Sequence, residues 1–432
     1  MTSSILWQNI AKTITLIDIP QSIAAAQGAV QNPCHDELLS TNAVETPFTT
    51  NEPKTAAKIA KLTAASGDHE LHERYAAILR DGLAVVKTAH ERDWCLPRTF
   101  VVTSTGKRKR EETDTPTVLD ELVATESSSE DITVTATIAD GPEYTDNYCR
   151  LAHRANQDDV SSLSASLDDK LVYNREMNQA TIRMRTTSET GNIYRVPPRS
   201  SFYLGDCHSG RDFRIAIRAQ AEHEDSCKDF DFILLDPPWP NRSVRRTHKT
   251  PGSTYSIAPN LNEVEDLLFG MDLDMLMADD CLVGLWITNK PAAREMVLGE
   301  GGLFASWGVQ LCEEWVWLKT TIHGEPITPI EATWRKPYEV LLLGRKRCID
   351  AAGILPVQTK IIVGVPDLHS RKPCLRELME PLVPNKENYR ALEVFARYLV
   401  AGWCSWGNEC IKFNSTEHWK SRGSKRPRPS NA

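Results

Sequence analysis

The sequence predicts an α/β fold built on a doubly wound, mainly parallel sheet, with an N-terminal extension before it. From Leu171 onward, short apolar runs alternate with helix-like stretches at the spacing that is typical of such sheets. The run Phe232 to Leu235 is apolar throughout, as expected for a strand buried on both faces, and it ends abruptly in an acid, two prolines and an aromatic residue. The 432 residues suffice for two domains, or for one sizeable α/β domain with an extension.

Four segments can be distinguished along the chain. Residues 1–103 form the extension, in which apolar residues recur at three- and four-residue spacing from Asp68 to Trp94 and predict an amphipathic helix that packs on its own domain. Residues 104–165 are rich in Ser, Thr, Asp and Glu, which predicts a flexible acidic linker. The predicted sheet domain covers residues 166–416, and residues 417–432 are expected to form a basic, disordered tail.

The predicted elements of the sheet domain follow one another in a regular order. Strands are expected at 171–173, 193–196, 201–204, 232–235, 281–287, 314–318, 340–343 and 361–365, with a last pair at 392–395 and 410–413. Helices are expected at 263–268, 292–298 and 375–380. The sequence contains neither G-x-G-x-x-G nor G-x-x-x-x-G-K-[ST], which excludes a standard dinucleotide fingerprint and a phosphate loop.

Charge is distributed unevenly along the chain. The formal net charge of −8 gives by itself no indication of a nucleic-acid partner. However, twelve basic and six acidic residues lie between Arg371 and the C-terminus, so this part carries most of the local positive field. Its basic tail residues are candidates for phosphate contacts: Lys420, Arg422, Lys425, Arg426 and Arg428.

Cysteine usage and targeting signals indicate an intracellular protein. The eleven cysteines include no C-x-x-C pair, and no N-terminal apolar segment has the pattern of a signal peptide, so reduced thiols are expected. No apolar run approaches the ~20 residues needed to cross a bilayer, which predicts a soluble protein without a membrane partner. The basic tetrad Lys107 to Arg110 is a candidate nuclear-import patch, so we expect the nucleus, with the cytoplasm as a further location.

The most informative stretch is the tetrad Asp236, Pro237, Pro238 and Trp239. Open α/β sheets place their ligands at the carboxyl ends of their strands, where this tetrad follows an apolar run. The prolines fix φ and lack backbone donors, so we expect carbonyl oxygens that face the pocket as uncontested acceptors beside the charged acid. Such a platform suits an amino group on a flat ring. The alternative is an ordinary Asp-Pro turn with a tryptophan that caps the core.

Four further polar segments complete the pattern. A basic loop follows the tetrad and suits phosphate contacts, although a merely solvated loop is the alternative; its residues are Asn241, Arg242, Arg245, Arg246 and Lys249, with Tyr255 beyond them. Trp334, Lys336 and Glu339 precede the strand at 340–343 and are further candidates for substrate contacts. The cationic loop His369 to Pro373 contains Lys372, which can meet a ligand carboxylate. The last segment runs from Phe395 and Arg397 to Asn408 and Glu409, whose side chains can hold ribose hydroxyls.

These motifs, in this order, resemble the eukaryotic N6-adenine methyltransferases of the DPPW class, the MT-A70-like family. The resemblance covers roughly residues 170 to 415 and rests on D-P-P-W, L-W-I-T-N, H-S-R-K-P, F-A-R-Y and W-G-N-E. The S-V-R-R after the tetrad and the W-C-S-W-G-N-E near the end are most similar to the branch of methyltransferase-like protein four. That branch has F-A-R where the messenger-RNA enzyme has F-G-R.

The resemblance implies a Rossmann-like class I methyltransferase fold, with the catalytic motif before the cofactor motif, and S-adenosylmethionine as methyl donor without a metal. By position, Asp206 is expected to contact the cofactor adenine and Lys372 its methionine carboxylate. Phe395 and Arg397 are expected to line the cofactor cleft beside Asp236 and Pro237, and Asn408 and Glu409 to reach the ribose. The target amine is expected to donate to Asp236 and the Pro237 carbonyl, between Trp239 and Tyr255.

The predicted reaction is direct methyl transfer to the N6 amine of adenine. Because this amine is a weak nucleophile, two acceptors that hold its N–H groups and aim its nitrogen at the methyl carbon would accelerate the attack. The branch implies adenosine, including 2′-O-methyladenosine, in small nuclear RNA, and a chain that acts as a monomer, although a partner subunit is not excluded. DNA adenine is the second candidate substrate, and an inactive nucleic-acid-binding subunit is the third. Protein amides and cytosine N4 fit less well, because related enzymes with those targets usually carry Asn and Tyr or Phe in the tetrad.

Overall fold

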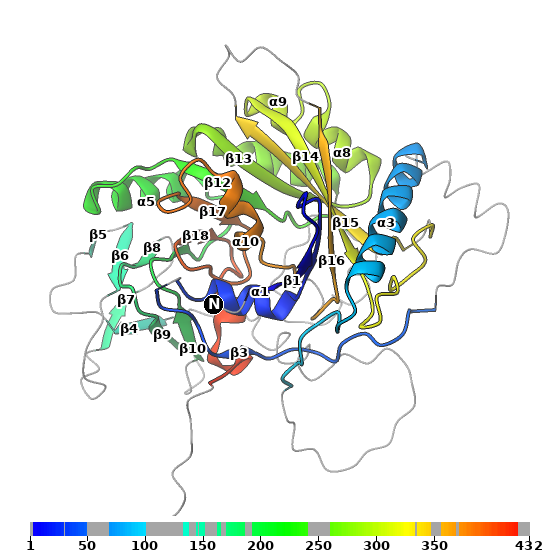
Figure 1. Cartoon of the computed structure of the whole chain (residues 1–432). Coiled ribbons are helices and arrows are strands. Elements are labelled where there is room, and N and C mark those ends of the chain that lie inside the picture. The colour runs from blue at the N-terminus through cyan, green and yellow to red at the C-terminus, as the bar shows by residue number, and fades with distance from the viewer. Residues whose placement is uncertain are drawn as a thin grey trace, which may run out of the picture.

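A computed structural model shows a central sheet of 13 strands in the order β1-β2-β16-β14-β15-β13-β12-β17-β18-β11-β8-β6-β5 (Figure 1). The structure describes residues 3–29, 31–49, 69–100, 133–137, 144–145, 147–151, 162–165, 170–185, 192–240, 260–332, 335–346, 356–368 and 371–421. Within these ranges, no helix is both long and apolar enough to span a membrane.

The centre of the sheet is parallel. Strand β12 (Phe230–Leu235) lies between β13 (Met277–Ile287) and β17 (Ala391–Val394), and it is parallel to both. Beyond β17 follow β18 (Trp403–Trp406) and β11 (Ser201–Tyr203), again in parallel. The chain therefore enters β12 and continues to one side through β13 and later to the other side through β17. This change of direction is the place where open α/β sheets bind ligands.

Antiparallel pairs extend the sheet on both sides. Strand β15 (Tyr338–Lys346) pairs in antiparallel with β13 and with β14 (Val309–Lys319), and β14 runs parallel to β16 (Gln358–Gly364). On the other side, β8 (Leu171–Asn174) runs antiparallel to β11, followed by β6 (Tyr148–Leu151) and β5 (Tyr144–Thr145). The predicted α/β fold with a mainly parallel sheet is confirmed.

Helices cover both faces of the sheet. Successive apolar side chains of a strand point to opposite faces, so each face has an apolar surface that helices bury. Ile233 and Leu235 of β12 belong to one core cluster, and Phe232 and Leu234 belong to the other. The first face is covered by α3 (His69–Ala89), α5 (Gly210–His223), α7 (Leu261–Gly270), α8 (Pro291–Leu298) and α9 (Leu303–Ser306). The second is covered by α1 (Ile19–Ala26) and α10 (Arg376–Met379).

The N-terminal extension forms one edge of the sheet. Strand β1 (Ile5–Gln8) pairs with β2 (Ile14–Ile17), and β2 runs parallel to β16. Helix α3 lies beside β14 to β16, as Figure 1 shows, and buries Tyr75, Leu79, Leu83 and Val86 against the first face. The predicted amphipathic helix that packs on its own domain is therefore confirmed, and the extension is part of the sheet.

Among the described residues, two small sheets and four short helical turns lie outside the main sheet. One sheet has the order β10-β9-β4-β7, and its strands are Asn192–Val196, Ala180–Arg185, Thr133–Thr137 and Ser162–Ala165. The other joins β19 (Trp419–Lys420) to β3 (Glu37–Leu38). The turns are η1 (Leu273–Leu276), η2 (Glu380–Leu382), η3 (Lys412–Asn414) and η4 (Thr416–His418). Strands β4 to β7 fall within the range 104–165, most of which lies outside the described residues.

Several predicted elements differ from the structure. The expected strand at 410–413 is wrong: its apolar residues Cys410, Ile411 and Phe413 are buried in a turn and in η3, and the last strand of the main sheet is β18. The expected helix at 375–380 is a single α-turn, α10, followed by η2, since Pro381 cannot continue the hydrogen-bond pattern. The strand at 193–196 belongs to the four-stranded sheet rather than to the main one.

Candidate active site

Asp236 is the first residue after β12, at the carboxyl end of the central strand. Both neighbouring strands, β13 and β17, run parallel to β12 and end at the same edge. Their carboxyl ends therefore surround the Asp236 carboxylate with the residues that follow each strand. This position agrees with the predicted platform at a ligand-binding edge.

Asp236 belongs to a cluster of four charged side chains. The Lys372 Nζ atom lies 3.3 Å from Asp236 Oδ1, and it also donates to Glu339, which follows Tyr338 at the start of β15. A second cation, Lys319 at the end of β14, donates to the other Glu339 oxygen. Two lysines and two carboxylates from four separate segments thus form a continuous series of ion pairs, from Lys319 through Glu339 and Lys372 to Asp236.

Burial and this charge pattern shift the ionisation of the cluster. Burial raises the pKa of Asp236, and Lys372 and Arg397 oppose this rise. Burial also acts to raise the pKa of Glu339, but the two lysines outweigh it and hold that pKa well below its usual range. For Lys372, burial favours the neutral amine, yet Asp236 and Glu339 dominate and raise its pKa. Lys372 and Glu339 are therefore a stable ion pair at neutral pH, and Asp236 is the more easily protonated carboxyl.

Aromatic side chains wall the cavity that opens beside Asp236. The cavity has a volume of about 390 Å³ and is lined by Asp236, Trp239, Pro240, Trp286, Ile287, Thr288, Asn289, Lys319, Lys336, Tyr338, Glu339 and Lys372. Trp239 is fixed because its Nε1 donates to the Trp286 carbonyl at 2.8 Å. The Lys372 ammonium lies 4.9 Å from the centre of the Trp286 ring, a cation–π distance. Aromatic walls beside several charged and polar groups suit an aromatic ring that carries polar substituents.

One expectation about the tetrad is wrong. The Pro237 carbonyl is not an uncontested acceptor, because the Trp239 backbone N–H donates to it at 2.8 Å. This turn is the reason that Trp239 folds back toward the end of β13. A carbonyl oxygen has two lone pairs, so one remains for a ligand.

The carboxyl ends of β17 and β18 form the adjoining half of the site. Phe395 directly follows β17 in a left-handed conformation with φ of 60°, which costs a non-glycine residue about 1 kcal/mol or more. Gly407 directly follows β18, and a Cβ atom there would lie 3.3 Å from Phe395 Cα. Arg397 Nε lies 3.6 Å from Glu409, which also accepts from Lys412 at 2.7 Å. The backbone here is therefore strained and closely packed, as functional sites often are.

The remaining predicted cofactor residues lie at the same edge. Asp206 follows β11 and is exposed, and its carboxylate accepts from the His208 backbone N–H at 3.0 Å. Asn408 is also exposed, one residue after Gly407. Together with Arg397 and Glu409, they border the ends of β11, β17 and β18, so the structure brings these predicted residues to one edge. No group of three or more His, Cys, Asp or Glu among the described residues could hold a metal ion.

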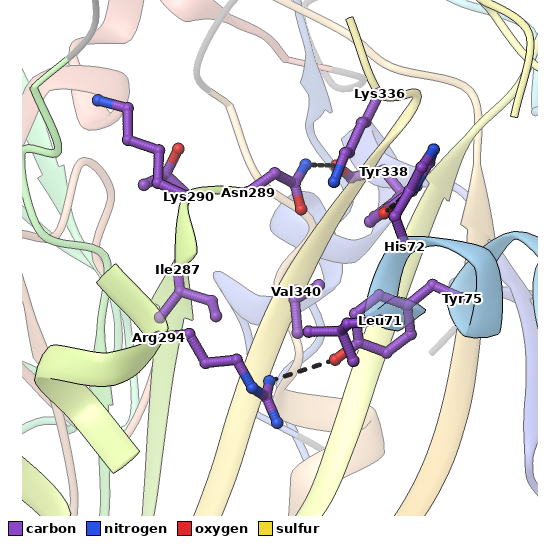
Figure 2. Close-up of a pocket in the computed structure, with 11 residues that line it drawn as sticks. Leu71, His72, Tyr75, Ile287, Asn289, Lys290, Arg294, Lys336, Tyr338 and Val340 are labelled. Atoms are coloured by element: carbon purple, nitrogen blue, oxygen red, sulfur yellow. Dashed lines mark hydrogen bonds between the residues drawn. The ribbon is translucent and has the colours of Figure 1, made fainter. Parts of the chain in front are cut away.

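A second, smaller pocket adjoins the cavity and includes helix α3. Figure 2 shows His72 and Tyr75 of α3 pointing toward β13 and β15, with Lys336 and Tyr338 facing them. His72 Nδ1 lies 2.7 Å from the Tyr338 hydroxyl, and Arg294 donates to Tyr75. Since Lys336 and Tyr338 line both pockets, the N-terminal extension supports one wall of the cavity.

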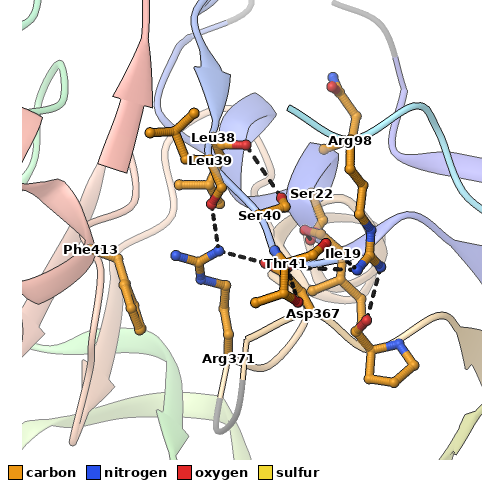
Figure 3. A network of polar contacts seen from close by, with 12 residues as sticks. Ile19, Ser22, Leu38, Leu39, Ser40, Thr41, Arg98, Asp367, Arg371 and Phe413 are labelled. Atoms are coloured by element: carbon orange, nitrogen blue, oxygen red, sulfur yellow. Dashed lines mark hydrogen bonds and ion pairs between the residues drawn. The ribbon is translucent and has the colours of Figure 1, made fainter. Parts of the chain in front are cut away.

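The loop that carries Lys372 is anchored by a buried ionic network (Figure 3). Arg371 and Asp367 form an ion pair in which both side chains are 0% exposed. Arg98 of the extension lies 3.7 Å from Asp367 and donates to the carbonyls of Val365 and Pro366. Arg371 also donates to the Leu39 carbonyl at 3.0 Å. The extension therefore holds the residue next to Lys372.

Part of the predicted site lies outside the described residues, and part of the observed site was not predicted. Outside them lie Asn241, Arg242, Arg245, Arg246, Lys249, Tyr255 and Trp334, as well as the tetrad 107–110 and all of the tail after Ser421. Lys319 and Trp286 were not among the predicted residues. Each lies within one residue of the carboxyl end of a predicted strand, and that position is the signal that could have indicated them.

Comparisons with known proteins identify the family of the chain. The sequence model of the MT-A70 family matches residues 230–409. The chain is 31% identical over 448 residues to "N6-methyladenosine RNA methyltransferase MTA1" of Pyricularia oryzae, across 99% of both proteins. It is 35% identical over 238 residues to "N(6)-adenine-specific methyltransferase METTL4" of Homo sapiens, covering 53% of this chain and 45% of that protein. It is 31% identical over 230 residues to "DNA N6-methyl methyltransferase" of Caenorhabditis elegans, covering 53% and 56%.

Proposed function

The chain belongs to the MT-A70 family, and from this premise we propose that it transfers a methyl group from S-adenosylmethionine to N6 of adenine in RNA. Small nuclear RNA is the first candidate substrate. RNA is favoured over DNA because the relative that matches nearly the whole chain is named as an RNA methyltransferase. We also propose that the protein acts as a monomer in the nucleus.

The observation that carries this proposal is the placement of Asp236 between two different environments. On one side lies the aromatic cavity with Trp239 and Trp286, and on the other lie Arg397 and Glu409 beyond β17. An adenine in the cavity and a methyl donor over the strand ends would both reach the Asp236 carboxylate. One acceptor can therefore orient the nucleophile toward the methyl carbon.

The residues of this chain fit such a methyl donor. Lys372 supplies a partly buried cation for a carboxylate, and Glu409 supplies an acceptor for ribose hydroxyls. When bound, S-adenosylmethionine supplies an electrophilic methyl group on a sulfonium. Asp236 would accept one N–H of the target amine and stabilise the positive charge that develops on its nitrogen. The second lone pair of the Pro237 carbonyl would accept the other N–H.

A base in a duplex cannot enter a cavity of this kind without leaving its stack. Single-stranded or looped RNA, whose bases are already splayed, is the substrate form that needs the least energy. Lys336 at the cavity wall and Lys420, which is exposed beside β3, are the described candidates for phosphate contacts. The basic loop after the tetrad and the tail are the candidates outside the described residues.

The test is a methyl-transfer assay with an isotope-labelled donor. The full chain is incubated with matched RNA and DNA oligonucleotides, with and without 2′-O-methylation of the adenosine, and mass spectrometry identifies the methylated nucleoside. We expect N6-methyladenosine in RNA and its loss in an Asp236→Ala variant. Incorporation of the labelled methyl group into DNA alone would overturn the proposal that RNA is the substrate. Incorporation into neither polymer would favour a binding subunit.

A further inference from the structure

Glu393 is a carboxylic acid in the middle of the sheet, where neither neighbour is charged. It is the third residue of β17, and its partners in register are Leu234 of β12 and Ser405 of β18. Leu234 and the flanking Ala391 of β17 belong to the apolar cluster that α1 and α10 cover. Because residues in register on adjacent strands share a face, Glu393 lies on that apolar face, close to the strand ends.

Two polar atoms at this point have no hydrogen-bond partner among the described residues. They are Glu393 Oε2 and the hydroxyl of Ser405, which are both buried. Buried polar atoms are rarely left unpaired, because each costs about 1–3 kcal/mol. Two such atoms on neighbouring strands indicate a place that a ligand completes. Phe395 and Arg397, which border the proposed donor site, follow Glu393 by two and four residues.

The charged and titratable groups around Glu393 come from three segments. Asp236 follows β12, Cys374 precedes α10, and Tyr398 follows β17. Burial, and then the charge of Asp236, raise the pKa of Glu393 to about 8. Burial raises the pKa of Cys374 to about 12 and that of Tyr398 well above its ordinary value. Neither of these groups can therefore supply a proton near neutral pH.

We propose that Glu393 is the counter-charge of the methyl donor: it releases its proton when the positively charged donor binds, and stays protonated beside the demethylated product. This inference rests on the proposed function. S-adenosylmethionine carries a sulfonium charge that its product lacks, so only the donor brings an additional positive charge to this acid. Asp236, the other carboxylate in this cluster of groups, is already paired with Lys372. Glu393 has no ion-pair partner among the described residues, so its charge can respond to the donor, and this response would favour the donor over the product.

The direction of the pH dependence follows from linkage. In the free protein Glu393 is protonated below about pH 8. A bound cation lowers the pKa of the acid, so donor binding releases up to one proton at neutral pH. The affinity for the donor therefore rises by at most about tenfold per pH unit up to about pH 8 and then stays constant. The affinity for the demethylated product should rise less steeply with pH.

The test counts protons by calorimetry. Binding enthalpies of S-adenosylmethionine and of its demethylated product are measured for the full chain at pH 7 in two buffers with different ionisation enthalpies. The α-amine, which titrates near pH 8 in such compounds, is common to both ligands, so its contribution cancels in the difference between donor and product. We expect the donor to release about one proton more than the product, because most Glu393 is protonated at that pH.

The isosteric variant Glu393→Gln should lose this difference, since an amide has no proton to release. Glu387→Gln, at an exposed position six residues earlier, is the matched control and should keep it. The proposal is overturned if Glu393→Gln keeps the difference in protons released between donor and product. It is also overturned if this difference is near zero in the wild-type chain, a result that does not depend on whether the variant folds. Failure of the wild-type chain to bind the donor at all would instead refute the proposed function, and with it this role of Glu393.

Discussion

The replacement Lys372→Met tests the charge cluster most directly. Methionine keeps the length of the side chain and removes the ammonium that lies 3.3 Å from Asp236. At this distance and an effective dielectric constant of about 20, Coulomb's law gives an attraction of about 5 kcal/mol. Lys372 and Asp236 are 17% and 27% exposed, and Arg397 remains nearby, so solvent and the second cation reduce the loss. We expect a net cost of about 1–3 kcal/mol, or about 5- to 150-fold in kcat/KM at neutral pH.

The pH profile distinguishes this effect from a simple loss of binding. Burial and Glu339 already raise the pKa of Asp236, and Lys372 is the first group that opposes them. Without Lys372 the pKa of Asp236 rises further, less of the carboxylate is ionised at a given pH, and the acid limb of kcat/KM moves to higher pH. Lys319→Met is the comparison, because Lys319 contacts Glu339 but not Asp236 and should move that limb much less. An equal shift of the acid limb in both variants, or no shift in Lys372→Met, would refute the reasoning.

Three further outcomes are expected. Asp236→Ala should abolish transfer of tritiated methyl groups with little change in the thermal midpoint, and wild-type turnover would contradict its role. Arg371→Met should lower the free energy of unfolding by about 3–5 kcal/mol, since it leaves the fully buried Asp367 with Arg98 alone; a urea midpoint equal to that of the wild type would argue against this. Truncation after Ser421 keeps the buried Trp419 of β19 and should reduce the affinity for RNA. The slope of log affinity against log salt concentration should become shallower by about 0.7 for each phosphate that the tail neutralises in the full chain. Identical salt slopes in a filter-binding assay would exclude the tail from binding.

The fold could be predicted where burial alone decides the structure. Strand β12 is apolar from Phe232 to Leu235 and ends at residues that cannot continue a strand, so its position and its functional edge follow from sequence. The family indicated by the motif order is confirmed by the comparisons. Helix α5 was missed because its sequence GRDFRIAIRAQAEH is polar and buries only a narrow stripe around Phe213 and Ile217. Strand β18 was missed because W-C-S-W was interpreted only as part of a binding motif.

The parts of the site that could not be predicted depend on contacts between distant segments. Lys319 and Lys372 meet at Glu339 because the end of β14, the start of β15 and the loop after β16 lie near one another, and no local pattern encodes this pairing. The same holds for Arg98, which reaches Asp367 across 269 positions of sequence. Glu393 looks like an ordinary charged residue in sequence. Only the register with Leu234 and Ser405 shows that it is placed inside the sheet.

The distribution of charge explains why the site needs support from the N-terminal extension. Asp236, Glu339 and Glu393 lie near the strand ends, and their mutual repulsion would protonate at least one of them without nearby cations. Lys372 reduces this repulsion only if its loop stays in place, and the buried Arg371, Asp367 and Arg98 network fixes that loop to the extension. A buried ion pair contributes little net stability, but breaking one is costly, so it specifies one position of the loop. Lys372 is thereby held between Asp236 and Glu339, and Glu393, which no lysine contacts among the described residues, is left as the carboxyl whose charge depends on what binds.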